Sequence, residues 1–214
     1  MKFGVVRFPG TCDEIDAIDA CARVGEGEIL WHRDRDLKDV DCVVIPGGFS
    51  HGDYLRVGAI ARFSPVMESV VRYAREGGLV FGICNGFQVL CEAGLLPGAL
   101  LPNTSLRFVC RQVDLEVVNA SIPWTRGCEV GQRLSIPAKH TTGRYWAPDL
   151  PEAQVVLRYA PGQNPNGSED DIAGVRNGQG NVFGLMPHPE HAVDPLTGSA
   201  DGLQLFLSAA RVPV

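Results

Sequence analysis

The chain has 214 residues, of which 45% are hydrophobic and 21% charged, and its formal net charge is -6. It is long and apolar enough to bury a sizeable core, which excludes an intrinsically disordered protein. Because the charge is mild and no run is rich in Lys or Arg, the composition argues against nucleic acid and anionic membranes as partners.

The first half of the chain alternates short apolar runs with helical patterns. Strands are predicted at 2–7, 28–31, 41–45 and 79–83, and helices at 13–24, 66–76 and 86–93. Because the strand runs are apolar throughout and most are separated by helices, the pattern predicts an open, mostly parallel sheet with helices on both faces. The third strand stops at Pro46, where two glycines permit a tight turn.

The second half changes character. The segment 112–118 alternates apolar and charged residues, which is typical of a half-exposed antiparallel strand. Further strands are predicted at 135–136, 154–159, 172–176 and 182–185, with a closing helix at 203–210. We find no internal repeat and no linker, and therefore predict a single domain over residues 1–214 with added antiparallel strands.

The seven cysteines are odd in number and scattered, and no two form a C-x-x-C pair. Such a set fits a reducing compartment better than a disulfide framework or a zinc site, so we expect a cytoplasmic protein with no metal. The N-terminal segment lacks the apolar length of a signal peptide, and no stretch approaches 18 uncharged apolar residues. We expect neither secretion nor a membrane span.

The stretch GICNG at 82–86 has the form of a nucleophile elbow, with Cys84 in place of serine. Small flanking residues let the backbone pass closely at a sharp turn between a strand and a helix, and both elements are predicted here. Unpaired N–H groups at the start of the helix favour a thiolate. A cysteine after a strand can equally be a small buried core residue, and local spacing alone hardly separates the two interpretations.

A cysteine nucleophile needs a base. The histidines at 32, 51 and 140 have no carboxylate at a spacing that would let it orient the imidazole. His188 differs, because two flanking prolines hold its segment extended and place Glu190, two residues later, on the same side. Glu190 can then orient the imidazole and stabilise its protonated form. In isolation P-H-P-E is more simply a surface turn, but beside an elbow cysteine a triad of Cys84, His188 and Glu190 is the better interpretation.

Acyl transfer from a thiolate develops negative charge on the carbonyl oxygen, which fixed backbone N–H groups stabilise. The N–H of Asn85 is one donor by elbow geometry. Gly47 and Gly48, at the end of a different strand, are candidates for the other, because strand ends of an open parallel sheet line one crevice. Taken alone, these two glycines indicate only a turn.

With these residues in place, the chain resembles the class I glutamine amidotransferases, which have a flavodoxin-like α/β fold. The resemblance is carried by PGGFSHGDYLRVGAIA at 46–61, GICNGFQVLCEAGLLPGALLPN at 82–103 and NPNGSEDDIAGVRNGQGNVFGLMPHPE at 164–190. It implies that Cys84 is the nucleophile, that His188 is the general base and acid, and that Glu190 orients the histidine. It further implies oxyanion contacts at Gly48 and Asn85 and a glutamine-holding role for Gln88.

These blocks are most similar to those of glutaminase subunits that serve purine biosynthesis. Such a subunit hydrolyses glutamine to glutamate and ammonia through a thioester and passes the ammonia on. The chain has no G-x-x-x-x-G-K-[ST] loop and no length for a nucleotide-binding synthase domain. The resemblance therefore implies no cofactor on this chain, a large synthase subunit that holds ATP and magnesium, and in many bacteria a small third subunit.

Two other interpretations stay open. A cysteine hydrolase or redox protein of the DJ-1/PfpI type would share the sheet and the elbow, but it would lack P-H-P-E. A non-catalytic scaffold of the same fold predicts a broken triad, whereas all three members are present here.

The chain departs from the family outside the triad: FPGTCDE lacks an asparagine before its cysteine, His51 replaces tyrosine, Thr-Thr at 141–142 replaces Gly-Glu, and His191 replaces arginine.

Overall fold

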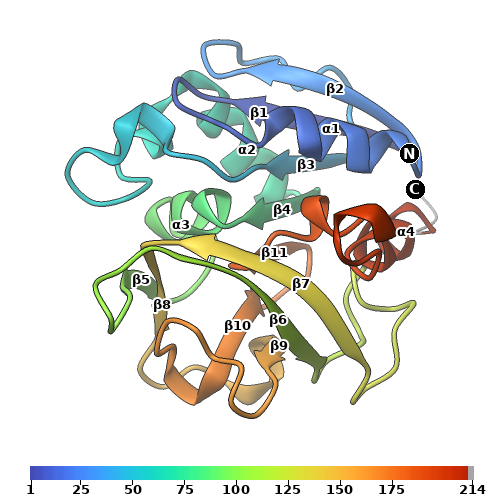
Figure 1. Ribbon diagram of the computed structural model, residues 1–214. Coiled ribbons are helices and arrows are strands. Elements are labelled where there is room, and N and C mark those ends of the chain that lie inside the picture. Colours follow the sequence, from blue (N-terminus) through green and yellow to red (C-terminus); the bar gives the residue numbers. More distant parts are fainter. Residues whose placement is uncertain (212–214) are drawn as a thin grey trace.

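The computed structural model describes residues 1–211. Its main sheet has nine strands in the order β2-β1-β3-β4-β11-β10-β9-β6-β7 (Figure 1). The first five are parallel, and they are β2 (Glu26–Trp31), β1 (Lys2–Arg7), β3 (Cys42–Ile45), β4 (Leu79–Ile83) and β11 (Val182–Leu185). The other four continue the sheet in antiparallel pairs, and they are β10 (Ile172–Arg176), β9 (Val155–Tyr159), β6 (Val109–Val117) and β7 (Arg133–His140).

Four α-helices cover the parallel half: α1 (Glu14–Ala22), α2 (Pro65–Arg75), α3 (Asn85–Glu92) and α4 (Leu203–Ala210). In Figure 1, α1 lies in front of the parallel strands and α2 behind them. Helices α1 and α4 contact each other, and α3 packs on β4 and β11. Short 3-10 turns lie at Ser50–Asp53, Ala61–Phe63, Glu152–Gln154, Glu169–Asp171, Pro189–His191 and Pro195–Thr197. The predicted α/β sheet with helices on both faces is confirmed.

Two strands were not expected from the sequence. β5 (Ala99–Pro102) and β8 (Thr142–Trp146) pair antiparallel in a separate small sheet. β7 is also much longer than the two residues predicted at 135–136. The reason is local composition: β7 contains Pro137 and charged residues, and β5 ends in a proline, so neither shows a strong strand pattern. The partner strand supplies the order that local propensity does not.

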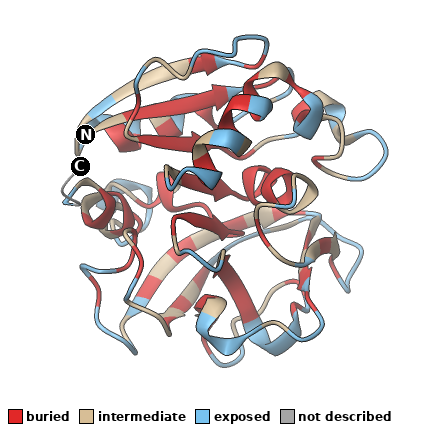
Figure 2. Ribbon diagram, turned by 180° about the vertical axis from the view of Figure 1, so that it is seen from behind, coloured by how far each residue is buried: buried red, intermediate tan, exposed pale blue. Residues whose placement is uncertain are grey.

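The core lies where the centre of the sheet meets the helices, and Figure 2 shows the central strands buried almost throughout. Phe81 on β4 stacks on Phe183 on β11 with ring centroids 5.0 Å apart, and Trp124 packs against both rings. All three side chains are fully buried. Buried aromatic rings contribute strongly to core stability, and here they join the two strands whose ends carry the candidate site.

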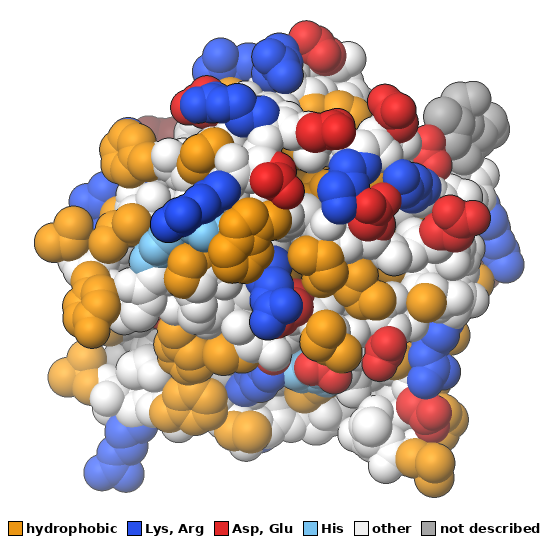
Figure 3. Space-filling view, turned by 90° about the horizontal axis from the view of Figure 1, so that it is seen from above, with side chains coloured by type: hydrophobic (Ala, Val, Ile, Leu, Met, Phe, Trp, Pro, Cys, Tyr) orange, Lys and Arg blue, Asp and Glu red, His pale blue; other side chains and the backbone are white. Residues whose placement is uncertain are grey.

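The distribution of charged side chains on the surface is consistent with the mild net charge. On the face seen in Figure 3, basic and acidic side chains are intermixed with hydrophobic ones, without a broad field of one sign. Within residues 1–211, none of the helices combines the length and apolarity needed to cross a bilayer.

Gly86 provides a test of how tightly the elbow is packed. A Cβ at this position would overlap the backbone carbonyl of Ile45 at the end of β3, which cannot move without disturbing the sheet. Gly86→Ala should therefore lower the free energy of unfolding by about 1–3 kcal/mol, measured by chemical denaturation. Gly178→Ala is the matched control, because a Cβ there meets no atom within 4 Å. Equal stabilities of the two variants would contradict this packing.

Candidate active site

Cys84 lies between β4 and α3 in a strained backbone conformation, with φ 49° and ψ -102°. A non-glycine residue in this region is rare and is held only by well-packed surroundings. Its N–H donates to the carbonyl of Leu185 at 2.8 Å, which ties it to the end of β11. A Cβ on Gly82 would collide with the backbone of Gly86, so both flanking glycines are required by close contact. The predicted nucleophile elbow is thus present in its geometry.

His188 follows β11 and is fully buried next to Glu190. Its Nδ1 lies 2.6 Å from Oε1 of Glu190, and its backbone N–H donates to the carbonyl of Pro137 on β7. The expectation of an extended segment is wrong, because Pro189–His191 forms a 3-10 turn. Pro189 fits the first position of a helical turn as well as an extended chain. The turn still brings the two side chains together, so the pairing was predicted for an incorrect geometric reason.

The charge state of His188 is set by its neighbours. Burial by itself lowers the pKa of an imidazole, but the Glu190 carboxylate and Cys84 outweigh this effect and raise the pKa of His188 to about 10. The histidine is therefore held as an imidazolium at neutral pH, hydrogen-bonded through Nδ1–H. An imidazolium beside a thiol is the arrangement that stabilises a thiolate nucleophile.

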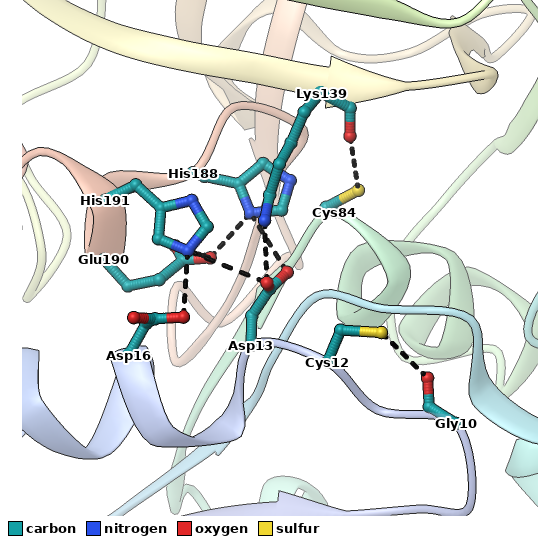
Figure 4. Close-up of polar contacts among 9 residues, drawn as sticks. All are labelled: Gly10, Cys12, Asp13, Asp16, Cys84, Lys139, His188, Glu190 and His191. Atoms are coloured by element: carbon teal, nitrogen blue, oxygen red, sulfur yellow. Dashed lines mark hydrogen bonds and ion pairs between the residues drawn. The ribbon is translucent and has the colours of Figure 1, made fainter.

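Cys84 lies on the side of the His188 ring that faces away from Glu190 (Figure 4). Its Sγ contacts the backbone carbonyl of Lys139 at 3.8 Å. Nε2 of His188 is buried and has no hydrogen-bond partner among the described residues. The nitrogen that is not engaged by Glu190 is thus free to exchange a proton with the thiol or with a substrate.

Asp13, at the start of α1, was missed by the sequence reasoning. Its carboxylate lies 3.5 Å from Nδ1 of His188 and forms a 2.7 Å ion pair with Lys139 (Figure 4). No spacing in the sequence links residue 13 to residue 188, and only the packing of α1 against the 3-10 turn after β11 brings them together. A Cβ on Gly47 would strike both Asp13 and His188, so this glycine serves close packing around the histidine.

Four potential metal ligands meet at this point, namely Asp13, His188, Glu190 and His191, with ligand atoms within 4.8 Å of one another. The rings of His188 and His191 stack with centroids 5.2 Å apart. The group already contains cations, since the Lys139 ammonium is paired with Asp13 and His188 is held as an imidazolium. This arrangement balances charge without a metal ion.

Gly48 lines the same cavity as Cys84, and Asn85 directly follows Cys84 in the chain. Neither Gly48 nor Asn85 donates its backbone N–H to an acceptor among the described residues. Gly48 has φ 141°, and a Cβ there would collide with the backbone of residues 10–12, so only glycine fits. Asn85 is the first residue of α3, where N–H groups have no partner within the helix. The N–H groups of Gly48 and Asn85 therefore stay candidates for the oxyanion hole, and so does that of Gly47, which likewise donates to no acceptor among the described residues.

A cavity of about 340 Å³ opens beside Cys84. Two of its lining residues, Gln88 and Thr142, are joined by a hydrogen bond from Nε2 of Gln88 to the carbonyl of Thr142, and Asn85 Nδ2 donates to Oε1 of Gln88 at 3.0 Å. Nδ2 of Asn85 also donates to Oδ1 of Asp53 at 3.2 Å. The predicted position of Gln88 facing the substrate cavity is consistent with this network, whereas Asp53 was not expected from the sequence.

His140, at the end of β7, also lines this cavity. Nδ2 of Asn166 lies 3.0 Å from Nε2 of His140 and 2.8 Å from the carbonyl of Gly143, while Oδ1 of Asn166 accepts from Ser168. Asn166 therefore presents its donor to His140, and Nε2 acts as acceptor with the proton assigned to Nδ1. Burial, with a smaller effect of His188, lowers the pKa of His140 to about 4. The NPNGS stretch thus positions the His140 ring through Asn166.

The fold and site define a glutamine amidotransferase. A family model described as CobB/CobQ-like glutamine amidotransferase domain matches residues 1–204, and the chain belongs to this family. Its relatives include proteins named phosphoribosylformylglycinamidine synthase subunit PurQ. The one from Nocardia farcinica is 56% identical over 97% of this chain and 95% of its own length, and the one from Rubrobacter xylanophilus is 55% identical over 97% of both.

Solved structures support the same family assignment. A chain in the structure of PurLQS from Thermotoga maritima is 45% identical, with a TM-score of 0.92 over 97% of this chain and 96% of that chain. A second glutamine amidotransferase from Thermotoga maritima is 17% identical with a TM-score of 0.62, which supports the fold alone.

The depressed pKa of His140 predicts acid sensitivity. In the unfolded chain the pKa is about 6.5, and in the folded chain it is about 4. The unfolded state therefore binds the proton first, and stability is lost as the pH falls from about 6.5 towards 4. His140→Gln retains an acceptor for Asn166 but cannot titrate. Between pH 7.5 and 5, its free energy of unfolding should fall by about 2 kcal/mol less than that of the unchanged protein.

Urea denaturation at a series of pH values measures this difference. Parallel stability curves for the two proteins would contradict the neutral, buried state of His140.

Proposed function

We propose that this chain is the glutaminase subunit of phosphoribosylformylglycinamidine synthase in purine biosynthesis. It hydrolyses glutamine to glutamate and ammonia and supplies the ammonia to a synthase partner, which converts formylglycinamide ribonucleotide to formylglycinamidine ribonucleotide. The observation that carries the proposal is near full-length similarity, at about 56% identity, to subunits of that name. The elbow cysteine beside a buried histidine–glutamate pair supports it chemically.

In the proposed mechanism, the Cys84 thiolate attacks the side-chain amide carbon of glutamine. The new C–S bond forms as the carbonyl becomes an oxyanion, and the N–H groups of Gly48 and Asn85 are the proposed donors to that oxyanion. The imidazolium of His188 then gives the proton on Nε2 to the departing nitrogen, which leaves as ammonia. Glu190 holds the ring by accepting a hydrogen bond from Nδ1–H.

The γ-glutamyl thioester is then hydrolysed. His188, now neutral, accepts a proton from a water molecule that attacks the thioester carbon, and the C–S bond breaks to release glutamate. The raised pKa of His188 favours the imidazolium that the first half of the reaction needs at its start and that the second half restores. Gln88, in the cavity beside the thiol, is proposed to hold the glutamine during both steps.

Ammonia released into neutral water would become ammonium and lose its nucleophilicity. We therefore propose direct transfer to a large synthase subunit, which holds ATP and magnesium, with a small third subunit as in the PurLQS assembly from Thermotoga maritima. We also propose that the complex is cytoplasmic. All seven cysteines are free, and Cys12 and Cys110 are exposed, which suits a reducing compartment.

The alternative of a DJ-1/PfpI-type cysteine hydrolase or redox protein has less support. The His188–Glu190 hydrogen bond provides the proton donor that release of ammonia requires. A non-catalytic scaffold is disfavoured because Cys84, His188 and Glu190 come together with free oxyanion donors.

Cys84→Ala tests the division of labour between subunits. In the reconstituted synthase complex, the variant should lose glutamine-dependent synthesis by about 1,000-fold or more, because the nucleophile is gone. Synthesis with added ammonium salts should persist, because that chemistry belongs to the partner. Loss of both activities would contradict the proposal, and so would retention of glutamine-dependent synthesis.

The mouth of the cavity suits a partner. Phe49, Tyr54 and Leu55 expose large apolar side chains here, with Leu55 90% exposed, and Phe49 and Leu55 line the cavity itself. Exposed apolar groups gathered at a reactive centre are typical of an interface. Leu55→Asp should weaken binding to the synthase subunit at least about tenfold, measured by titration of the purified subunits.

Val130→Asp is the matched control for this experiment. Val130 is 69% exposed and lies in the turn before β7, at the opposite end of that strand from His140. A similar loss of affinity in both variants would show that the mouth of the cavity is not the docking surface.

A further inference from the structure

One charged group in the cavity beside Cys84 has no part in the hydrolysis steps described above. Asp53 lines the cavity together with Gln88 and is the only Asp, Glu, Lys or Arg among the lining residues. No cation in the described chain offsets its charge: the influences on its pKa are burial and a hydrogen bond from Asn85.

The position of Asp53 is fixed from two sides. It ends the 3-10 turn Ser50–Asp53 and has φ 52°, a left-handed conformation that Asp and Asn tolerate better than most residues. Asn85 holds the same turn at both ends, since its Oδ1 accepts from the N–H of Ser50 and its Nδ2 donates to Oδ1 of Asp53. The second carboxylate oxygen of Asp53 has no hydrogen-bond partner among the described residues.

This placement carries an electrostatic cost. Burial raises the pKa of Asp53 to about 6, although the hydrogen bond from Asn85 acts in the opposite direction. A half-buried carboxylate without a counter-charge is destabilised relative to water, and a cationic group of a ligand removes that penalty. The wall of the cavity is therefore complementary to a positive charge.

We propose that Asp53 binds the α-ammonium group of the substrate glutamine. The inference rests on the proposed function, which puts the side-chain amide of glutamine at Cys84. The α-ammonium is the one cation that glutamine carries, and Asp53 is the one acidic side chain that the cavity offers to it. Gln88 and Thr142 present neutral groups, so they cannot supply this charge. Asp53 thereby selects free glutamine over glutamine whose α-amino group is acylated.

The experiment compares two substrates on two proteins, in the reconstituted synthase complex. L-Glutamine carries the α-ammonium, whereas glutaramate has the same side-chain amide and carboxylate without it. Asp53→Asn keeps the left-handed turn and retains an acceptor for Asn85, but it removes the negative charge. It should lower kcat/KM for glutamine hydrolysis by about 10- to 100-fold, mostly through KM. The value for glutaramate should change less than about threefold.

Asp149→Asn is the matched control, because Asp149 also has a left-handed backbone, with φ 61°, but is exposed and outside the cavity. Equal losses for glutamine and glutaramate would overturn the proposal, because they would mean that Asp53 only shapes the loop through Asn85. An unchanged kcat/KM for glutamine would overturn it as well. If the unsubstituted complex did not hydrolyse glutamine, the proposed function would fail instead, so the two failures are distinguishable.

Discussion

The parallel pairing of β4 with β11 is the contact on which the site depends. It sets Ile83 opposite Leu185, and the N–H of Cys84 donates to the carbonyl of Leu185. Residues 84 and 188 are far apart in the sequence, yet both emerge from the carboxyl ends of adjacent strands and therefore meet. The stacked pair of Phe81 and Phe183, two residues further back in the same register, anchors the two strands to each other. A shift of this register by one residue would turn the flanking side chains to the opposite face of the sheet.

Sequence patterns predicted the parts of the site that lie on regular elements. The apolar strand, the glycines around Cys84 and the following helix are local features, and local geometry decides them. The His188–Glu190 pair was found from its spacing, but the reason was incomplete, since Pro189 starts a turn rather than extending the chain. Contacts between segments that are distant in the sequence could not be predicted from local patterns. Asp13 reaches His188 only because α1 packs on the turn after β11, and β8 exists only through its pairing with β5.

The pKa values of two buried histidines near Cys84 are shifted in opposite directions by their surroundings. Burial by itself lowers the pKa of His188, but Glu190 and Cys84 outweigh it and raise the value to about 10. Burial, with a smaller effect of His188, lowers the pKa of His140 to about 4, and the neutral ring accepts a hydrogen bond from the amide nitrogen of Asn166. Separation of pKa values by environment assigns different chemical tasks to the same residue type. One ring is suited to proton transfer, whereas the other offers a neutral polar wall to the substrate cavity.

Histidine stands at position 191, where the resemblance to the family implies an arginine. The ring stacks on His188 with an interplanar angle of 5°, and its Nε2 lies 3.3 Å from Asp16 and 3.7 Å from Asp13. A permanent cation is not required here, because Lys139 already neutralises Asp13 at 2.7 Å. A flat ring can cover the proposed base without adding a fixed positive charge beside an imidazolium, which would oppose its protonation. His191 therefore packs on the ring of His188, whose charge is set by Glu190 and Cys84.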